Sequence, residues 1–147
     1  MFKLDYNKML ELDAEDLAEG GIRRAYQPVQ KILSQYVAEP AQIQEVVDND
    51  DRSYIVRCGG EEYVIYSPAL PDDRGQSWGR ATHAFFRTVN DQRSKSEYRL
   101  YAINGGNDLG GMFFTQIEYE GVRKSLRKED WPYLPTLEHP WYGQCHG

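Results

Sequence analysis

The stretch from Tyr98 to Ile117 contains the densest group of residues suited to turn or ligand chemistry. Its central loop, 104–111, reads Asn-Gly-Gly-Asn-Asp-Leu-Gly-Gly and lies between two apolar, aromatic runs of strand composition. Gly, Asn and Asp accept the left-handed backbone of tight reversals, so the loop predicts a hairpin connection. Asn107 and Asp108 could instead hold a cation. However, the alternating acids and distal Glu of a calcium loop are missing, and the Gly spacing is not that of a dinucleotide site.

The other candidates for catalysis or metal binding lack partners at a suitable spacing. His83 has no Ser, Cys or acid fixed near it, which favours a surface histidine over a general base. Cys58 and Cys145 are expected to be free thiols in a reducing compartment. Cys145 with His139 and His146 has no second ligand pair at metal spacing. The sequence therefore predicts no catalytic residue, no metal and no cofactor.

Adjacent carboxylates are also poor catalysts here. Neighbouring residues of a strand point to opposite faces, so Glu61-Glu62 does not make an acid pair. Asp72-Asp73 falls in a Pro-, Asp- and Gly-rich loop and is expected to be solvated. The chain has no Gly-x-Ser-x-Gly, phosphate loop, His-Glu-x-x-His or Cys-x-x-Cys motif. We therefore predict that the protein is not an enzyme.

The charge is negative and uneven along the chain. The 147 residues include 23 acids and 17 Lys and Arg, for a net charge of −6; residues 1–73 hold 15 of the acids and only 7 of the bases. An acidic protein is a poor ligand for phosphates and is better suited to docking on a basic partner. No apolar run approaches the roughly 20 residues of a membrane span, and no signal peptide is evident. We expect a cytoplasmic protein that binds neither nucleic acid nor membrane.

The elements that position these residues predict one α+β domain over residues 1–147. An apolar face at helical spacing, including Ile22, Tyr26, Val29 and Leu33, predicts a helix after a break at Gly20-Gly21. Pro28 is expected to kink that helix or to begin a new one. The predicted organisation is helical at 1–38, strands at 42–67, a helix at 77–92, a hairpin at 97–117, and a short helix and extended tail at 118–147.

These elements define the expected fold class and the role of the tail. We predict a helical N-terminus, a mainly antiparallel sheet of about five strands, one long helix packed on a face of the sheet, and an extended aromatic and proline-rich C-terminal tail. The tail from Trp131 to Tyr142 holds four aromatic residues and three prolines. The prolines keep it extended without regular pairing. Its aromatic side chains either seal the core or anchor a partner.

Two stretches of the chain carry a family resemblance. Tyr101-Ala-Ile-Asn-Gly-Gly-Asn-Asp-Leu-Gly-Gly-Met112 and Asp130-Trp-Pro-Tyr-Leu-Pro135 resemble segments of the immunity proteins of bacterial polymorphic-toxin and contact-dependent growth inhibition systems. The resemblance implies a small cytoplasmic protein that binds one cognate toxin domain, here expected to be a nuclease, and blocks its active site stoichiometrically. It implies no catalytic residues.

The expected contact pairs an acidic patch with Lys and Arg of the toxin cleft, and aromatic side chains fix the complex. The residues assigned to it are Asp48, Asp50, Asp51, Glu61, Glu62, Asp72, Asp73, Trp131, Tyr133, Trp141 and Tyr142. Two alternatives stay open. One is a small-ligand-binding or enzymatic domain that uses the Gly-rich loop 104–111, and the other is a structural subunit of a larger assembly.

Overall fold

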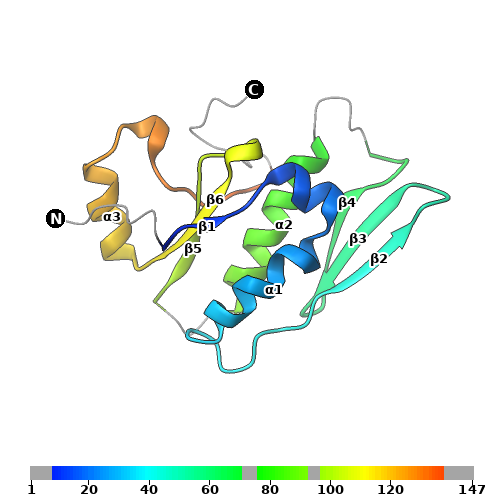
Figure 1. Ribbon diagram of the computed structural model, residues 1–147, viewed down its shortest axis with the longest axis horizontal. Coiled ribbons are helices and arrows are strands. Elements are labelled where there is room, and N and C mark those ends of the chain that lie inside the picture. The colour runs from blue at the N-terminus through cyan, green and yellow to red at the C-terminus, as the bar shows by residue number, and fades with distance from the viewer. Residues whose placement is uncertain (1–7, 71–75, 93–96, 138–147) are drawn as a thin grey trace.

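The computed structural model describes residues 8–70, 76–92 and 97–137, and these form an α+β arrangement around one helix, α2 (Gln76–Gln92). Two three-stranded antiparallel sheets lie on either side of α2 (Figure 1). One sheet has the order β2-β3-β4, and the other has the order β1-β6-β5. Their strands are β1 (Leu10–Glu11), β2 (Gln44–Asp48), β3 (Ser53–Cys58), β4 (Glu61–Tyr66), β5 (Arg99–Ile103) and β6 (Gly110–Phe114).

The helix α2 is buried because it is covered on more than one side. It contacts β4 of one sheet, β5 of the other, and the helix α1 (Ile22–Leu33), which runs beside it in Figure 1. Small residues such as Ala81 and Ala84 let these neighbours approach, and Phe85, Phe86 and Val89 fill the space between them without exposure. The helix predicted at 77–92 is thus present and begins at Gln76, one residue before the predicted start.

The predicted helix after Gly20-Gly21 is α1, and its buried residues are those that the spacing indicated: Ile22, Tyr26, Val29 and Leu33. The segment before it is a single π-helical turn, η2 (Asp16–Gly20), and the chain turns at Gly21 with φ 112°. Pro28 does not begin a new helix. It lies inside α1 and is exposed, and it removes one backbone N–H from the helix.

The prediction of a helical N-terminus is wrong at residues 10–11, which form the short strand β1. It pairs antiparallel with β6, in the register Leu10 with Gly111 and Glu11 with Gly110. Glycine allows this approach, because a Cβ on Gly110 would lie 2.7 Å from the Met9 sulfur and 3.2 Å from the Leu10 carbonyl oxygen. The predicted segment before residue 8 lies outside the described residues.

The single sheet of about five strands is also wrong. The β5–β6 hairpin pairs with β1 and not with β4, because α2 stands between the two sheets. Nor is there one long helix on a sheet face, since α1 has 12 residues beside the 17 of α2. None of the helices in the described ranges is long and apolar enough to cross a membrane.

A second, smaller core lies between the β5–β6 hairpin and α3 (Gln116–Lys124), which is the short helix predicted after the hairpin. Thr115 and Glu118 form a capping box at its start. Two 3-10 turns complete the structure, η3 (Gly106–Asp108) and η4 (Lys128–Asp130). The tail then returns along β5, where Tyr133 forms one antiparallel bridge with Ala102, so it does pair at a single residue.

Candidate functional site: an acidic groove beside a helix pair

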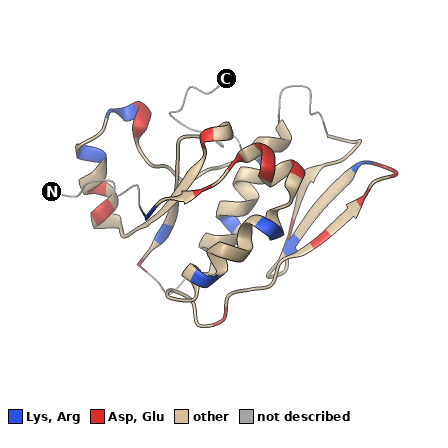
Figure 2. Ribbon diagram, in the orientation of Figure 1, with Lys and Arg blue, Asp and Glu red and all other residues tan. Residues whose placement is uncertain are grey.

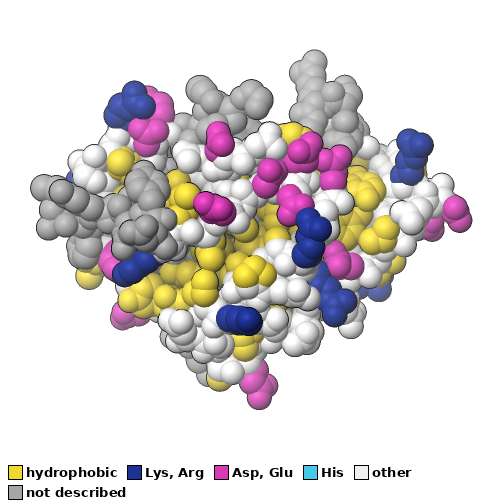
Figure 3. Space-filling view, in the orientation of Figure 1, with side chains coloured by type: hydrophobic (Ala, Val, Ile, Leu, Met, Phe, Trp, Pro, Cys, Tyr) yellow, Lys and Arg dark blue, Asp and Glu magenta, His cyan; other side chains and the backbone are white. Residues whose placement is uncertain are grey.

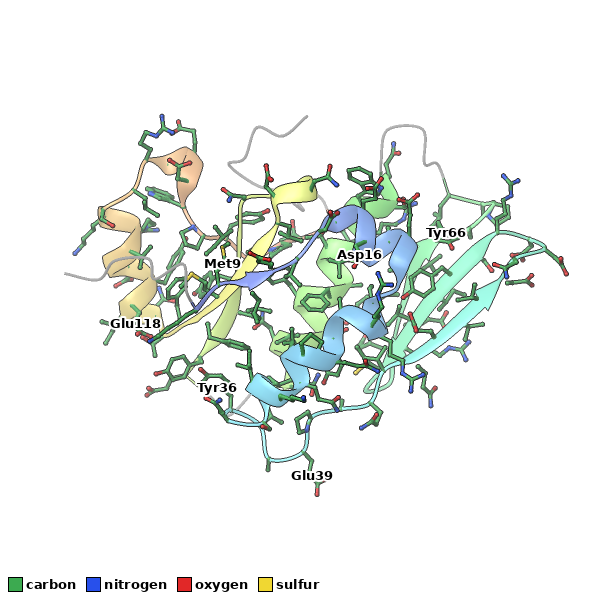
Figure 4. All side chains as sticks on the ribbon, in the orientation of Figure 1. Met9, Asp16, Tyr36, Glu39, Tyr66 and Glu118 are labelled. Atoms are coloured by element: carbon green, nitrogen blue, oxygen red, sulfur yellow. The ribbon has the colours of Figure 1, made fainter. Side chains whose placement is uncertain are left out.

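A groove of about 1060 Å³ opens between β1, η2 and α1. Met9 and Asp16, labelled in Figure 4, come from its β1 and η2 sides. We call it the acidic groove. The described residues that line it are Met9, Leu10, Glu11, Leu12, Asp13, Glu15, Asp16, Leu17, Glu19, Gly20, Arg24, Ala25, Pro28 and Val29.

The acidic groove combines negative charge with an apolar surface. Its five carboxylates come from nine consecutive positions, 11–19, and the one base among the described lining residues is Arg24, which pairs with Asp16. Figure 2 shows the acids together on β1 and η2, and Figure 3 shows them above an apolar surface. Such a surface matches a partner segment that carries Lys or Arg beside apolar side chains.

Local hydrogen bonds hold the acidic segment in place. The Asp13 carboxylate accepts from the backbone N–H groups of Glu15 (2.9 Å) and Asp16 (3.2 Å), and so caps the turn that follows it. The Asn107 side-chain amide donates to the two Asp13 carboxylate oxygens at 3.1 and 3.3 Å. The Gly-rich loop therefore supports the rim of the acidic groove.

The Gly-rich loop is the hairpin connection that its composition predicted. Asn104 and Gly106 adopt positive φ of 58° and 59°. The Asn104 carbonyl oxygen accepts a hydrogen bond from the Tyr133 hydroxyl at 2.5 Å, and Asn107 is bonded to Asp13. These contacts favour a structural role over a ligand loop. The described ranges contain no group of three or more His, Cys, Asp or Glu that could hold a metal ion.

The acids assigned from the sequence are not brought together. Asp48, Asp50 and Asp51 lie at the turn between β2 and β3, whereas Glu61 and Glu62 begin β4. The six residues of β3 separate the two groups, which places them roughly 17 Å apart. Glu62 is also paired with Arg57 at 2.8 Å. Of the other assigned residues, four lie outside the described ranges: Asp72, Asp73, Trp141 and Tyr142.

The two described aromatic residues of the tail contact the protein itself. Tyr133 is 5% exposed and belongs to the main core, and burial raises the pKa of its hydroxyl. Trp131 is half-buried; its indole N–H donates to the Leu126 carbonyl at 3.1 Å, and the Arg123 guanidinium lies 4.9 Å from its ring. Trp131 thus keeps some exposed surface, whereas Tyr133 seals the core.

The titratable side chains on and beside α2, His83 and Cys58, do not form a general acid–base pair. His83 is half-buried, so the expectation of a surface histidine is wrong, and its Nδ1 is buried without a hydrogen-bond partner in the described structure. Burial lowers the pKa of His83, Arg87 lowers it further, and Asp91 opposes them. Cys58 is a free thiol, and burial raises its pKa, with Asp91 adding to the effect. Such a thiol remains protonated and is a weak nucleophile.

The sequence reading missed the acidic groove as a site, although its acids are plain in the sequence. None of these acids was assigned to a binding site, and the pairing of β1 that forms the groove wall has no local signal. No protein-family model, curated protein or solved structure matches this chain. Its function is therefore inferred from the groove and from the chemistry of its lining.

Proposed function

We propose that this chain is an immunity protein that binds one cognate bacterial toxin domain with nuclease activity and blocks its active site stoichiometrically in the cytoplasm. The observation that carries this proposal is the acidic groove. A nuclease cleft binds phosphates through Lys and Arg, so an inhibitor that fills such a cleft presents carboxylates to the same side chains. In the groove these carboxylates lie beside apolar surface, which a nucleic acid would not use.

The two parts of the groove contribute at different stages of binding. The carboxylates raise the rate of encounter with a basic cleft, and this effect weakens as salt screens the charges. The apolar surface at Leu10, Leu12 and Pro28 then loses water against the partner and slows dissociation. The exposed Arg24–Asp16 pair is held weakly, so Asp16 can exchange Arg24 for a partner base at little cost.

The test is coexpression with the product of the gene immediately upstream, followed by purification and a nuclease assay. We expect a 1:1 complex and complete loss of nuclease activity at one equivalent of this chain. The double variant E15K/E19K reverses two groove charges and should slow association by about tenfold at low salt. The control E97K/E120K makes the same charge change at exposed positions outside the groove.

Three results would count against the proposal. One is a failure to form any complex with the upstream product. Another is an equal loss of association rate in both double variants, which would mean that net charge and not the groove matters. The third is substrate turnover by the purified chain alone.

A further inference from the structure

The strand β2 is an unpaired edge of its sheet. Within the described residues it pairs only with β3, and no backbone hydrogen bond joins its other side to another element. Figure 1 shows it at the outer side of the sheet. Natural edge strands are usually protected by Pro, Lys or a bulge, because an open edge can pair with another chain. The sequence of β2, Gln-Glu-Val-Val-Asp, has neither Pro nor Lys, and its two charged residues are both acids.

The register of β2 places one exposed valine on each face of the sheet. Val47 pairs with buried Tyr54 on the inner face and is 54% exposed, and Val46 pairs with Ile55 on the outer face and is 41% exposed. Their neighbours along the strand, Glu45 and Asp48, put a carboxylate on each face. The free edge therefore offers an apolar centre between two acids.

The edge is connected to α1 by hydrogen bonds through Tyr54, and it adjoins the acidic groove. The Tyr54 hydroxyl accepts a hydrogen bond from the Ile22 backbone N–H at 2.8 Å and donates to the Glu45 carboxylate. That carboxylate reaches Gly21, where a Cβ would lie 3.3 Å from it, and the preceding Gly20 lines the groove. The groove and the inner side of β2 thus meet at the start of α1.

Two kinds of strand could pair with this edge, one from a second copy of the chain and one from a basic partner, and their charges distinguish them. A second copy of the chain would bring Glu45, Asp48, Asp50 and Asp51 of both molecules to one seam, with Arg52 as the base within the turn. Like charges facing each other across strands are destabilising. A strand with Lys or Arg on either side of apolar residues would meet opposite charges at Glu45 and Asp48 and apolar surface at the valines.

We propose that β2 accepts an extended segment of a basic protein partner as a fourth strand of the β2-β3-β4 sheet. The segment has apolar residues opposite Val46 and Val47, and Lys or Arg opposite Glu45 and Asp48. Backbone hydrogen bonds supply affinity, and the side-chain pattern supplies selectivity. The proposal rests on the proposed function only for the identity of the partner.

The direct test uses the peptide acetyl-Thr-Lys-Val-Val-Lys-Thr-amide and amide NMR spectra of the full chain. We expect chemical-shift changes centred on Gln44–Asp48 and cross-strand contacts between peptide and β2 protons. The variant V47K should weaken binding by at least about fivefold through charge repulsion and lost apolar contact. The matched control I117K makes the same kind of change at a residue that is 72% exposed on α3, and should bind as the original does.

Backbone pairing is tested separately with a peptide N-methylated at both valines. Whichever valine directs its N–H at β2 then loses that donor, and its N-methyl group blocks the approach of the strand. Strand addition predicts that this peptide does not bind, and equal binding of the two peptides would overturn it. Shift changes confined to residues 9–20 would overturn it as well, because they would place the peptide in the acidic groove.

The complex with the upstream gene product separates this inference from the proposed function. Strand addition predicts that β2 amides exchange hydrogen more slowly in the complex. A neutralised toxin that leaves β2 exchange unchanged would refute strand addition and leave the immunity function standing. Peptide pairing at β2 without any toxin complex would support strand addition and refute the immunity function.

Discussion

Tyr54 connects three elements through one hydroxyl group. It accepts from the first N–H of α1 and donates to Glu45 on β2 from its own position on β3. Burial and the bond to Glu45 raise the pKa of this hydroxyl, so it stays protonated at neutral pH and keeps its donor. The same residue thus fixes the start of α1, the groove helix, and the carboxylate at the sheet edge.

The variant Y54F removes this hydroxyl and leaves the ring. The Ile22 N–H then loses its partner in a buried position, and we expect the free energy of unfolding in urea to fall by about 1–3 kcal/mol. The matched control is Y66F, because Tyr66 pairs with Tyr54 across the sheet and its hydroxyl makes no hydrogen bond within the described residues. An equal loss in both variants would contradict the role assigned to the Tyr54 hydroxyl.

His83 predicts a pH dependence of stability. Burial lowers its pKa in the folded protein below the ordinary 6.5, so below pH 6.5 the unfolded chain binds a proton that the folded chain does not. Stability should therefore fall as pH decreases from 6.5 toward the lowered pKa, and should be unaffected by this group above pH 7.5. Urea unfolding of the original and of H83Q at several pH values isolates the effect, since the difference between them should shrink or reverse at low pH. Parallel curves at all pH values would exclude it.

At the level of residues, sequence periodicity predicted the buried face of α1 well. Ile22, Tyr26, Val29 and Leu33 pack on one side only, so a 3.6-residue period identifies them. The surface position expected for His83 did not rest on periodicity, and it was wrong because α2 is covered by a sheet on each side. The width of a helix's buried face depends on how many neighbours pack on it, and that number is not encoded in the helix itself.

Among the elements, α3 depends most on its cap. It has only nine residues, and Val122 is its only fully buried side chain, so its first turn gains much from the Thr115–Glu118 box. The hydroxyl of Thr115 accepts from the Glu118 N–H at 3.1 Å, and the Glu118 carboxylate accepts from the Thr115 N–H at 2.9 Å.

We expect T115A to lower the unfolding free energy by about 1 kcal/mol and T115S to retain most of it, because serine keeps the accepting oxygen. Amide exchange of residues 116–124 should accelerate in T115A more than exchange in α2. A T115S variant as unstable as T115A would show that the threonine methyl group, and not the hydrogen bond, stabilises this end of the helix.

The sequence predicted most elements but not how they pair. Strands at 42–67 and 97–117 and the helix at 77–92 follow from local composition, and all are present within small shifts of their ends. The pairing of Leu10 with Gly111 joins positions about a hundred residues apart, and two residues carry no periodicity. The division into two sheets likewise depends on where α2 packs, which no single segment specifies.

In the whole molecule, α2 is a helix that both sheets contact. Phe85 has no exposed surface and sits in the main core with residues from both sides, including Val56 of β3 and Leu100 of β5. If the sheets depend on each other through α2, a cavity in its centre should weaken both together.

The variant F85A should lower the unfolding free energy by about 3–5 kcal/mol and keep a single urea transition. Hydrogen exchange should accelerate in β3 and β5 alike. The control I117A removes a side chain that is 72% exposed and should change stability by less than about 0.5 kcal/mol. Faster exchange in one sheet alone would mean that the sheets unfold independently.

The sequence predicted the overall charge correctly, but it did not predict where the acids lie on the folded surface. The net charge of −6 follows from composition alone. Five of the acids lie at 11–19 and line the groove, because β1, η2 and α1 fold around that segment. The acids predicted as one patch are instead divided between the two ends of β3. Position along the chain indicates which charges exist, and only the pairing of distant segments places them on one surface.

The bridge between Tyr133 and Ala102 has a practical consequence for how the protein is handled. Ala102 donates to the Tyr133 carbonyl at 2.7 Å and accepts from its N–H at 3.0 Å. A chain cut before Tyr133 would leave these groups of β5 without partners and uncover the apolar surface beneath the tyrosine ring. Chains truncated before Tyr133 should therefore aggregate through β5. An affinity tag should be added to a chain that keeps every residue up to and including Tyr133.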